Sequence, residues 1–456
     1  MSWLESVRDP IDWACVYCGE AGSLQHHKSY RYKDYDYHLH RCGRCRSLIY
    51  DPSAMGPLFG RAPEYTQSRT GMKYYFEVGY SPRFTAQCAV AAIPDIGLDA
   101  LKGYNFLDIG AGNGVGSFIA QDLFGLAVQA VEPSLTGEHG RELFGLDVER
   151  RYFEQFDDEL LSRLKSKPCL VHLDAVIEHL RDPRTLLKNL TQSLDVRVLC
   201  GLVPDGDEIH LHEPFSTSLP FLAPSDHVHL PTAEGMAQLF RDLGFPHVRV
   251  EKDCKLLIVT GAKEPMPEPS AQRTDIVTAW LQERLAQHWS APVAQGAMAR
   301  MLIDAVGRNQ PARVKALSER LLPKLDPAPL IRKLDGGASW DDIPFYCGDV
   351  SFWLAVDHLR NARFDDALAA LDVPEAFAAR ISVDYPEFAM NPQLYKWEAR
   401  LLKAEIFKLQ GRLAEARELL ISVLDALADP FSPPPEPIAS RAQTALAGLT
   451  PEKAAA

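Results

Sequence analysis

The stretch YNFLDIGAGNGVGSF, Tyr104–Phe118, combines an apolar strand, a glycine-rich turn and the beginning of a helix. A turn of this kind is typical of a site that cradles a nucleotide-like ligand. The P-loop pattern is excluded because no Lys-Ser or Lys-Thr pair follows the turn. The dinucleotide pattern GxGxxG is also broken, since Val115 stands where its third glycine is required.

Two acids flank this turn and indicate which ligand it holds. Asp108 lies at the end of the strand before the turn, and Glu132 ends the next strand, in the sequence AVEPS. A carboxylate at Asp108 is poorly suited to a negatively charged pyrophosphate, but it suits a cofactor with a cationic ammonium group. Glu132 is placed to accept hydrogen bonds from both hydroxyls of a ribose. Together the two acids predict S-adenosylmethionine as the cofactor.

Between Tyr104 and about Ala262, short apolar strands alternate with helical stretches. This alternation is typical of a mainly parallel sheet that is covered on both faces. The last two strands, around HVRVEKD and KLLIVTGA, are joined by a short turn and are expected to form an antiparallel hairpin at one edge. The run EPMPEPS, Glu264–Ser270, is a Pro-rich linker and marks the clearest domain boundary.

Four of the nine cysteines form two CxxC pairs, Cys15 with Cys18 in CVYC and Cys42 with Cys45 in CGRC. Such pairs bring four thiolates together from two tight turns, as tetrahedral zinc requires. The segment between them alternates like a strand and has too few apolar residues to fold on burial alone. We therefore predict a structural zinc site, with a redox CxxC or two accidental pairs as the alternatives.

The segment between the two CxxC pairs is rich in tyrosine and basic residues. Its rings could form a stacking surface for single-stranded nucleic acid. We favour a structural interpretation, in which the rings occupy the faces of ribbon strands, because acids interrupt the basic run and the chain is acidic. The tyrosines concerned are Tyr30, Tyr32, Tyr35 and Tyr37.

Four motifs between Tyr104 and Ala262 occur in a recognisable order: LDIGAGNG, VEPS, DAVIEHLRDP and DHVHLPTAEGMAQLFRDLGF. In this order and spacing they resemble the class I S-adenosylmethionine-dependent methyltransferases. The resemblance implies an α/β fold with a Rossmann-like seven-stranded methyltransferase sheet. It also implies that Glu132 holds the ribose and that the segment from Asp174 to His179 lies beside the sulfonium. The implied cofactor-binding residues are Asp108, Gly110, Gly112, Gly114, Glu132 and Asp174.

The sequence RCGRCRSLIYDP, followed by these motifs, resembles the bacterial branch of methyltransferases with an N-terminal zinc-binding domain. That branch includes deoxysugar C-methyltransferases and proteins thought to modify cell-surface glycans. In the sugar enzymes a Glu-His pair abstracts a proton, and Asp226 and His227 of PSDHVHLPT fall on that pair. The resemblance therefore implies His227 as general base with Asp226 to orient it, and His179 as the second candidate. Glu178 is expected to begin or cap a helix.

The sequence EIHLHEP, Glu208–Pro214, is a further histidine-rich stretch. It could be a metal site or an ordinary loop.

Residues 271–456 are expected to be helical almost throughout, as an all-α, tetratricopeptide-like domain. Two helical hairpins stand out because small residues recur at matching offsets, which lets antiparallel helices approach closely. The first contains Ala355, Ala362 and Ala367, and the second contains Ala404, Gly411 and Ala416. The two units are separated by more than the 34-residue repeat, so an irregular helical domain is predicted.

The composition indicates which binding partners and which cellular compartment are expected for this protein. A formal net charge of −13 over 456 residues argues against binding of duplex nucleic acid, which requires a basic surface. No stretch approaches the roughly 20 apolar residues that span a bilayer, and the N-terminus does not resemble a signal peptide. A cytoplasmic protein with reduced thiols is therefore expected.

The sequence thus predicts a chain of several parts with one catalytic centre. The expected function is methylation of a sugar or glycan-type acceptor at oxygen or carbon. The alternative is a methyltransferase that acts on a protein or rRNA recruited through the zinc and helical domains. The parts are a zinc-ribbon-like domain (1–52), a helical connector or lid (53–103), the methyltransferase domain (104–263), a linker (264–270) and the helical domain (271–456).

Overall fold

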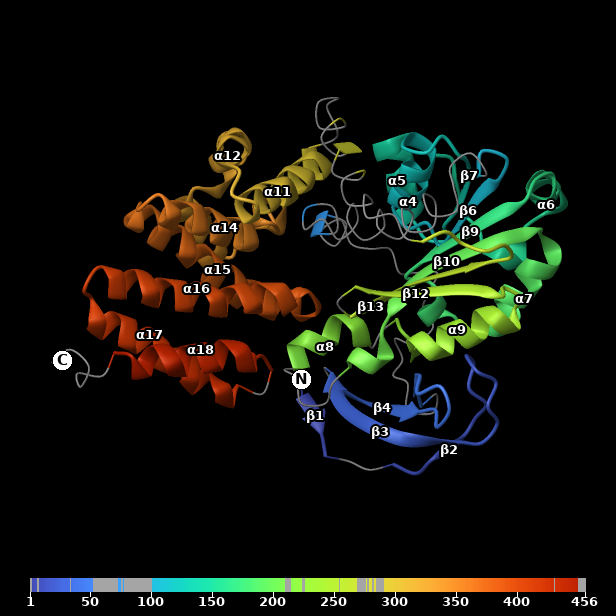
Figure 1. The fold of residues 1–456 in the computed structure, drawn as a ribbon, viewed down its shortest axis with the longest axis horizontal. Coiled ribbons are helices and arrows are strands. Elements are labelled where there is room, and N and C mark those ends of the chain that lie inside the picture. Colours follow the sequence, from blue (N-terminus) through green and yellow to red (C-terminus); the bar gives the residue numbers. More distant parts are fainter. Residues whose placement is uncertain are drawn as a thin grey trace.

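The structure is a computed structural model and describes residues 2–5, 8–32, 34–51, 73, 74, 77, 101–209, 215–223, 226–253, 255–268, 276, 279, 280, 283, 291–429 and 431–449. These residues form a small N-terminal sheet, a larger sheet with helices, and a C-terminal array of helices (Figure 1). Most of the predicted connector, residues 53–103, lies outside the described residues.

The larger sheet has seven strands in the order β12-β13-β10-β9-β6-β7-β8, which confirms the predicted seven-stranded sheet. Strands β6 to β10 run parallel, whereas β13 is antiparallel to both of its neighbours. The predicted hairpin of the last two strands is present, with β12 at the edge and β13 inside the sheet. The strands are β6 (Asn105–Ile109), β7 (Ala127–Val131), β8 (Val148–Glu149), β9 (Cys169–Asp174), β10 (Val196–Pro204), β12 (His247–Asp253) and β13 (Leu256–Ala262).

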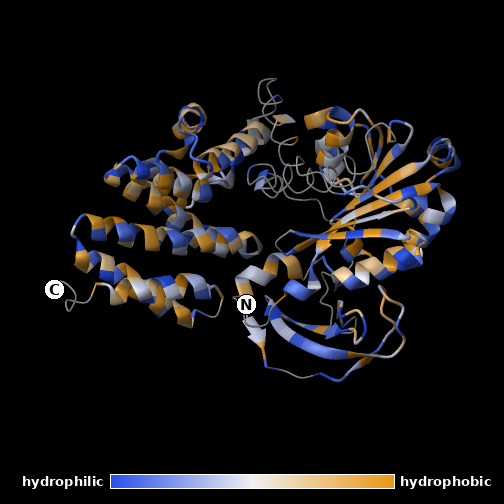
Figure 2. Ribbon diagram, in the orientation of Figure 1, coloured by the Kyte–Doolittle hydropathy of each residue, from blue (hydrophilic) through white to orange (hydrophobic). Residues whose placement is uncertain are grey.

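Helices cover both faces of this sheet because alternate strand residues enter two different hydrophobic cores. Phe106 and Leu170 pack in the core that contains residues of α4, whereas Leu107 and Val171 pack in the core that contains residues of α7 and α9. Figure 2 shows the apolar strands of this sheet between their covering helices. The helices are α4 (Val115–Asp122), α5 (Thr136–Phe144), η4 (Phe153–Gln155), α6 (Asp158–Lys165), η5 (Ile177–His179), α7 (Pro183–Ser193), η6 (Gly206–Glu208), α8 (Phe215–Leu222) and α9 (Ala233–Asp242).

The N-terminal sheet is completed by a strand from far along the chain. Its order is β1-β3-β4-β5-β11, with β2 paired to β3. Strand β11 pairs antiparallel with β5, so that His229 lies opposite Ile49 and Leu230 opposite Leu48. The strands are β1 (Ser2–Leu4), β2 (Ile11–Asp12), β3 (Ser23–Tyr32), β4 (Tyr35–Arg41), β5 (Leu48–Tyr50) and β11 (His229–Leu230).

The tyrosines of this sheet are mostly structural. Tyr30 and Tyr37 are 0% and 2% exposed and stack with ring centroids 5.2 Å apart. The hydroxyl groups of Tyr30 and Tyr50 are hydrogen-bonded at 2.7 Å. A surface for stacking bases requires exposed rings, so the structural interpretation holds for these residues, and only Tyr35 of the four is exposed.

The C-terminal part is helical, as predicted, and both predicted hairpins are present (Figure 1). In the first, α14 turns into α15 at Ala362, with φ of 55°; in the second, α16 turns into α17 at Gly411, with φ of 73°. Asn309, with φ of 53°, occupies the same position between α11 and α12. The helices are α11 (Ala291–Gly307), α12 (Pro311–Leu325), α13 (Pro327–Asp335), η7 (Trp340–Asp342), α14 (Cys347–Arg360), α15 (Phe364–Asp384), η8 (Pro386–Phe388), α16 (Met390–Leu409), α17 (Leu413–Asp425), η9 (Ala426–Ala428) and α18 (Glu436–Ala447).

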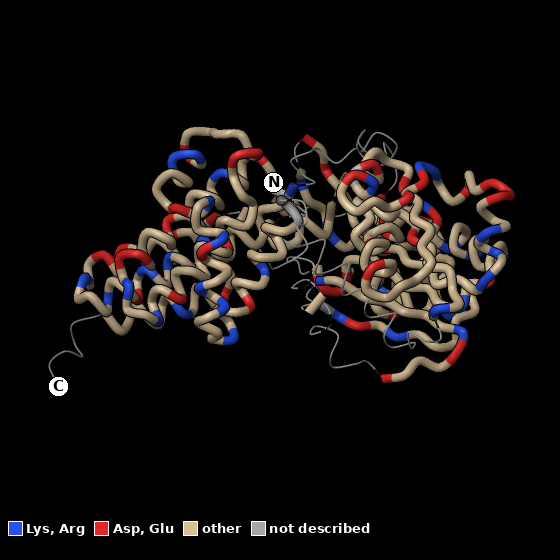
Figure 3. The backbone as a smooth tube through the Cα atoms, turned by 90° about the horizontal axis from the view of Figure 1, so that it is seen from above, with Lys and Arg blue, Asp and Glu red and all other residues tan. Residues whose placement is uncertain are grey.

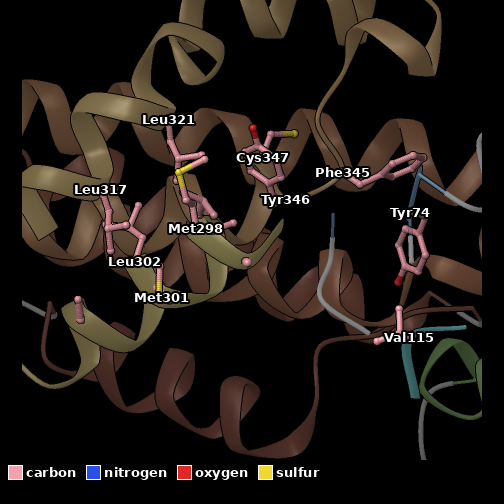
Figure 4. Packing of buried hydrophobic residues seen from close by; sticks show 14 of the residues in the cluster. Tyr74, Val115, Met298, Met301, Leu302, Leu317, Leu321, Phe345, Tyr346 and Cys347 are labelled. Atoms are coloured by element: carbon pink, nitrogen blue, oxygen red, sulfur yellow. The ribbon is translucent and has the colours of Figure 1, made fainter. Parts of the chain in front are cut away.

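One hydrophobic core joins the larger sheet to the C-terminal helices. Figure 4 shows Tyr74 between Val115 of α4 and Phe345 of the helical part. The ring of Tyr74 stacks on Phe388 with centroids 3.9 Å apart. Lys and Arg residues are interspersed with Asp and Glu residues along the helices (Figure 3). None of the helices in the described residues is long and apolar enough to cross a membrane.

Candidate functional site

The glycine-rich turn between β6 and α4 needs its three glycines for different reasons. Gly110, Gly112 and Gly114 all have positive φ, at 69°, 53° and 77°, where side chains are strained. A Cβ on Gly110 would lie 2.5 Å from Val176, and one on Gly114 would lie 2.6 Å from Leu146. A Cβ on Gly112 would meet nothing within 4 Å, so this glycine leaves open space beside the turn.

Glu132, at the end of β7, is tied directly to this turn. Its Oε2 accepts a hydrogen bond from the Gly112 amide at 2.9 Å, and its Oε1 accepts one from the Ser134 amide at 2.8 Å. Each carboxylate oxygen has two acceptor positions, so these bonds leave acceptor capacity for ribose hydroxyls. The acid and the glycine turn are thus held as one unit.

The side chain of Asp108 is buried and has two hydrogen-bond partners inside the protein. The Ser117 hydroxyl donates to its Oδ2 at 2.7 Å, and Nδ1 of His172 lies 2.9 Å from its Oδ1. Burial alone lowers the pKa of His172, but the charge and hydrogen bond of Asp108 outweigh burial and raise this pKa to about 9. Asp108 therefore faces a protonated imidazole. His172 was not among the predicted site residues, and its signal in the sequence is a histidine within the apolar strand CLVHLD.

The carboxyl end of β9 leads into the second group of predicted site residues. Asp174 ends the strand, and Ala175 turns the chain with φ of 53° while its amide bonds the Leu202 carbonyl at 2.9 Å. The short helix η5 follows and carries Glu178 and His179.

The structure brings Glu178, His179 and His227 together. One ligand-type atom from each of them lies within 4.8 Å of the others, and Nε2 of His227 is 3.9 Å from Oε1 of Glu178. Glu178 and His227 are buried, at 0% and 7% exposure, whereas His179 reaches the surface. Glu178 does lie in a helix, as expected, but neither of its side-chain oxygens has a hydrogen-bond partner among the residues that the structure describes, so it is not a helix cap there.

Backbone carbonyl groups, rather than the predicted acid, orient the two imidazoles. Nδ1 of His227 lies 2.7 Å from the carbonyl oxygen of Phe221, and Nδ1 of His179 lies 3.2 Å from that of Asp226. The prediction that Asp226 orients His227 is thus corrected. A carboxylate could not hold Nδ1 of His227 while Phe221 does, and Asp226 supplies its backbone oxygen to the other histidine.

The N-terminal sheet continues into this cluster through a chain of hydrogen bonds. The hydroxyl of Tyr17, within the first CxxC turn, bonds Nδ1 of His229, and Nε2 of His229 lies 2.7 Å from the Leu180 carbonyl. The amide of Val228 bonds the Glu178 carbonyl at 2.9 Å. These bonds join the chain around η5 to the chain around β11, and β11 in turn pairs with the N-terminal sheet.

The four paired cysteines form one buried cluster. The Sγ atoms of Cys15 and Cys45 are 3.5 Å apart, and those of Cys18 and Cys42 are 3.6 Å apart. Four sulfurs around zinc at bonds of about 2.3 Å stand roughly 3.8 Å from one another, so the donor set fits a tetrahedral metal.

Both cysteine turns have the same backbone geometry. The Gly19 amide bonds the Cys15 carbonyl at 2.9 Å, and the Arg46 amide bonds the Cys42 carbonyl at 3.1 Å. Gly19 and Arg46 both have positive φ, at 70° and 65°. The other histidine-rich candidate, EIHLHEP, lies outside the described residues from position 210 to position 214.

Parts of this chain are similar to known proteins. Residues 83–250 match a family model described as a methyltransferase domain. A search of curated protein sequences found no match. Similar solved structures include an S-adenosylmethionine-dependent methyltransferase from Thermotoga maritima, with 18% identity, a TM-score of 0.30, and coverage of 42% of this chain and 94% of that one.

Two further structures have a similar level of likeness. An O-methyltransferase family protein from Burkholderia thailandensis has 16% identity and a TM-score of 0.31, with coverage of 41% of this chain and 58% of that one. Human N-acetylserotonin methyltransferase, in complex with S-adenosylmethionine, has 14% identity and a TM-score of 0.32, with coverage of 43% and 57%. This chain thus spans less than two thirds of these two proteins, and TM-scores below 0.5 add nothing about its acceptor.

The family match covers the glycine turn, Glu132 and Glu178, which follow strands β6, β7 and β9 of the seven-stranded sheet. Residues 83–250 of the chain therefore carry an S-adenosylmethionine-dependent methyltransferase domain.

Proposed function

We propose that this enzyme methylates a hydroxyl oxygen or a carbon atom of a sugar or glycan-type acceptor. The observation that carries the proposal is the pair of imidazoles, His179 and His227, beside the carboxyl end of β9. Their rings are edge to face with centroids 4.8 Å apart. Transfer to a hydroxyl or a carbon acid requires proton removal, and the proposal gives that role to this pair.

In this proposal the cofactor binds along the glycine turn. Glu132 accepts the ribose hydroxyls, and the turn formed by Gly110, Gly112 and Gly114 lines the methionine end, with open space beside Gly112. Asp108 contributes negative charge beneath the turn and fixes the turn through Ser117 and His172. Asp174 lies at the strand end next to the sulfonium.

The chemical step is an in-line displacement, in which the protein mainly positions the two reactants. The acceptor atom forms a bond to the methyl carbon while the carbon–sulfur bond breaks. The electron pair of that bond stays on sulfur, which leaves neutral S-adenosylhomocysteine, and the proton of the acceptor is removed at the histidine pair.

Structural zinc at the four cysteines is part of the same proposal. Cys15, Cys18, Cys42 and Cys45 would hold the ion, which would take no part in the chemistry because four thiolates complete its coordination. Its role would be to fix the two turns that carry Tyr17 and Ser47 against the methyltransferase domain.

Cofactor binding tests the first part of the proposal. Isothermal titration of the full chain should show binding of S-adenosylmethionine or S-adenosylhomocysteine and none of NAD. Asp108→Ala and Glu132→Ala should both weaken binding, the first by loosening the turn and the second by removing the ribose acceptor. Unchanged affinity in both variants would contradict this assignment.

Acceptor profiling tests the second part. Labelled S-adenosylmethionine should be offered with nucleotide sugars, glycans, RNA and cell proteins in parallel. Transfer to a sugar supports the proposal. Efficient methylation of protein or RNA with no sugar accepted would favour the macromolecular alternative, in which the helical domain recruits the acceptor.

A further inference from the structure

We propose that Glu178, His179 and His227 bind a divalent transition-metal ion such as Mn²⁺, at a second site separate from the four cysteines. This inference rests on the proposed function, because it assigns the ion to removal of the acceptor's proton. It also changes the part played by the histidines, which become ligands.

The three side chains already lie close to coordination distance. Their ligand atoms lie within 4.8 Å of one another, and Nε2 of His227 is 3.9 Å from Oε1 of Glu178. Ligands bound at about 2.0–2.2 Å stand roughly 3–4.4 Å apart around one ion. Small rotations of the side chains are therefore enough to close the site.

The carboxylate of Glu178 gives an independent reason to expect a ligand. The side chain is fully buried, and neither of its oxygens has a hydrogen-bond partner in the described structure. Buried polar atoms are nearly always paired, because an unpaired one has lost its hydrogen bonds to water without replacing them. A cation between this carboxylate and the two imidazoles would satisfy both oxygens.

The imidazoles are held in the orientation that metal ligands adopt. Each Nδ1 donates to a backbone carbonyl, of Phe221 for His227 and of Asp226 for His179. For His227 this leaves the lone pair of Nε2 facing Glu178. A ligating histidine commonly has its other nitrogen fixed in this way. His229, the next histidine along, has both ring nitrogens engaged by Tyr17 and Leu180 and is not available as a ligand.

The donor set indicates the class of ion and its role. Two imidazoles and one carboxylate suit Mn²⁺, Fe²⁺, Co²⁺ or Zn²⁺ better than Mg²⁺, which prefers oxygen ligands. Three protein ligands leave coordination positions for other groups, and His179 opens the cluster to the surface. An acceptor hydroxyl bound there would lose its proton to solvent more easily, and its oxygen would then take the methyl group as the carbon–sulfur bond breaks.

The test is a titration of the full chain with Mn²⁺. The electron paramagnetic resonance signal of free Mn²⁺ measures how much of the ion stays unbound at each step. Wild-type protein should bind Mn²⁺ at this site, and Glu178→Gln and His227→Gln should weaken binding roughly 100-fold or more, since each removes a ligand. Glu159→Gln, at an exposed position of α6, and His247→Gln, at the start of β12, are matched controls that should bind as the wild type does.

If the site already contains a metal ion after purification, added Mn²⁺ will not report on it. Metal analysis of the purified proteins addresses this case, because Glu178→Gln should then hold one ion fewer per chain than wild type. Affinity for S-adenosylhomocysteine in Glu178→Gln reports folding and the cofactor site separately. Equal Mn²⁺ binding and equal metal content in wild type and Glu178→Gln overturn the metal site. If wild-type protein does not bind S-adenosylhomocysteine, that result would instead count against the proposed function.

Discussion

At the scale of single residues, the centre of the enzyme depends on polar groups buried beneath the cofactor turn. Asp108 and His172 form an ion pair whose side chains are 2% and 1% exposed. A buried pair of this kind is costly to break, because the remaining partner keeps its charge without compensation. Both residues lie on neighbouring parallel strands, so the pair also fixes the register of β6 against β9.

The Asp108–His172 pair should make stability depend on pH. The folded protein holds the His172 proton up to a pKa of about 9, whereas the unfolded chain releases it near 6.5. The stabilisation is therefore complete below pH 6.5 and is lost as pH rises through 9. Its size is on the order of 1–3 kcal/mol. Denaturant unfolding at pH 6 and pH 9.5 should show this loss in wild type and a smaller one in His172→Gln, and identical pH profiles would contradict it.

His227 is the residue whose loss should affect turnover most selectively. His227→Ala should lower kcat by roughly 10²–10⁴-fold, because the group that removes the acceptor's proton, or holds the ion that does so, is gone. Affinity for S-adenosylhomocysteine should stay unchanged, since the glycine turn and Glu132 are intact. Steady-state kinetics and isothermal titration measure the two effects, and a fully active variant would remove His227 from the mechanism.

At the scale of elements, the two predicted helical hairpins have turns of the same geometry, but different residues occupy the position with positive φ. In both turns the residue with positive φ bonds back to the carbonyl three positions earlier, from Ala362 to Leu359 and from Gly411 to Lys408. Glycine adopts this conformation without strain, whereas alanine does so at a cost of about 1 kcal/mol. The first hairpin therefore contains strain that the second lacks.

Reciprocal substitutions should reveal this difference. Gly411→Ala should destabilise the protein by about 1 kcal/mol, since a Cβ there meets nothing within 4 Å and only the backbone is strained. Ala362→Gly should stabilise it by roughly 0.5–1 kcal/mol, as relief of strain exceeds the entropy that glycine adds to the unfolded chain. Denaturant unfolding of both variants measures the two shifts, and shifts of the same sign would contradict the argument.

At the scale of the whole molecule, the cysteine cluster and the candidate catalytic cluster are mechanically connected. Tyr17 links the first cysteine turn to His229, which holds Leu180 beside His179. The second turn is bound to α9, because the Thr232 hydroxyl donates to the Cys45 carbonyl at 2.5 Å. If the cysteine turns become disordered, the positions of His229 and His179 should therefore change as well.

Removal of zinc should lower both stability and activity. Purified wild-type protein should contain zinc at the cysteine cluster, and Cys42→Ser combined with Cys45→Ser should abolish that content and lower the melting temperature. Methyl transfer should fall as well, because the support of His229 and Leu180 is weakened. Tyr17→Phe is the control that keeps the zinc and removes only the link. Full zinc content in the double variant would contradict the assignment of ligands.

Local sequence was sufficient to predict much of the fold. The glycine turn, the alternation of strands and helices and the matching small residues of the helical hairpins each depend on neighbouring residues, whose spacing specifies backbone conformation directly. Ala355, Ala367, Ala404 and Ala416 are all buried, as the matched offsets predicted, whereas Ala362 and Gly411 of the same two sets lie exposed in the turns. The paired CxxC spacing likewise predicted that four cysteines would meet.

Only the tertiary structure decided how distant segments combine at the site. The pairing of β5 with β11, the ion pair of Asp108 with His172, and the meeting of Glu178 with His227 all join residues far apart in the chain. Such contacts depend on strand order and on which face of the sheet each side chain occupies, and neither is encoded in local spacing. The sequence by itself therefore determined the elements and the cofactor turn, whereas the partners of each buried polar group were determined by packing, because a desolvated group must find its partner wherever the fold places one.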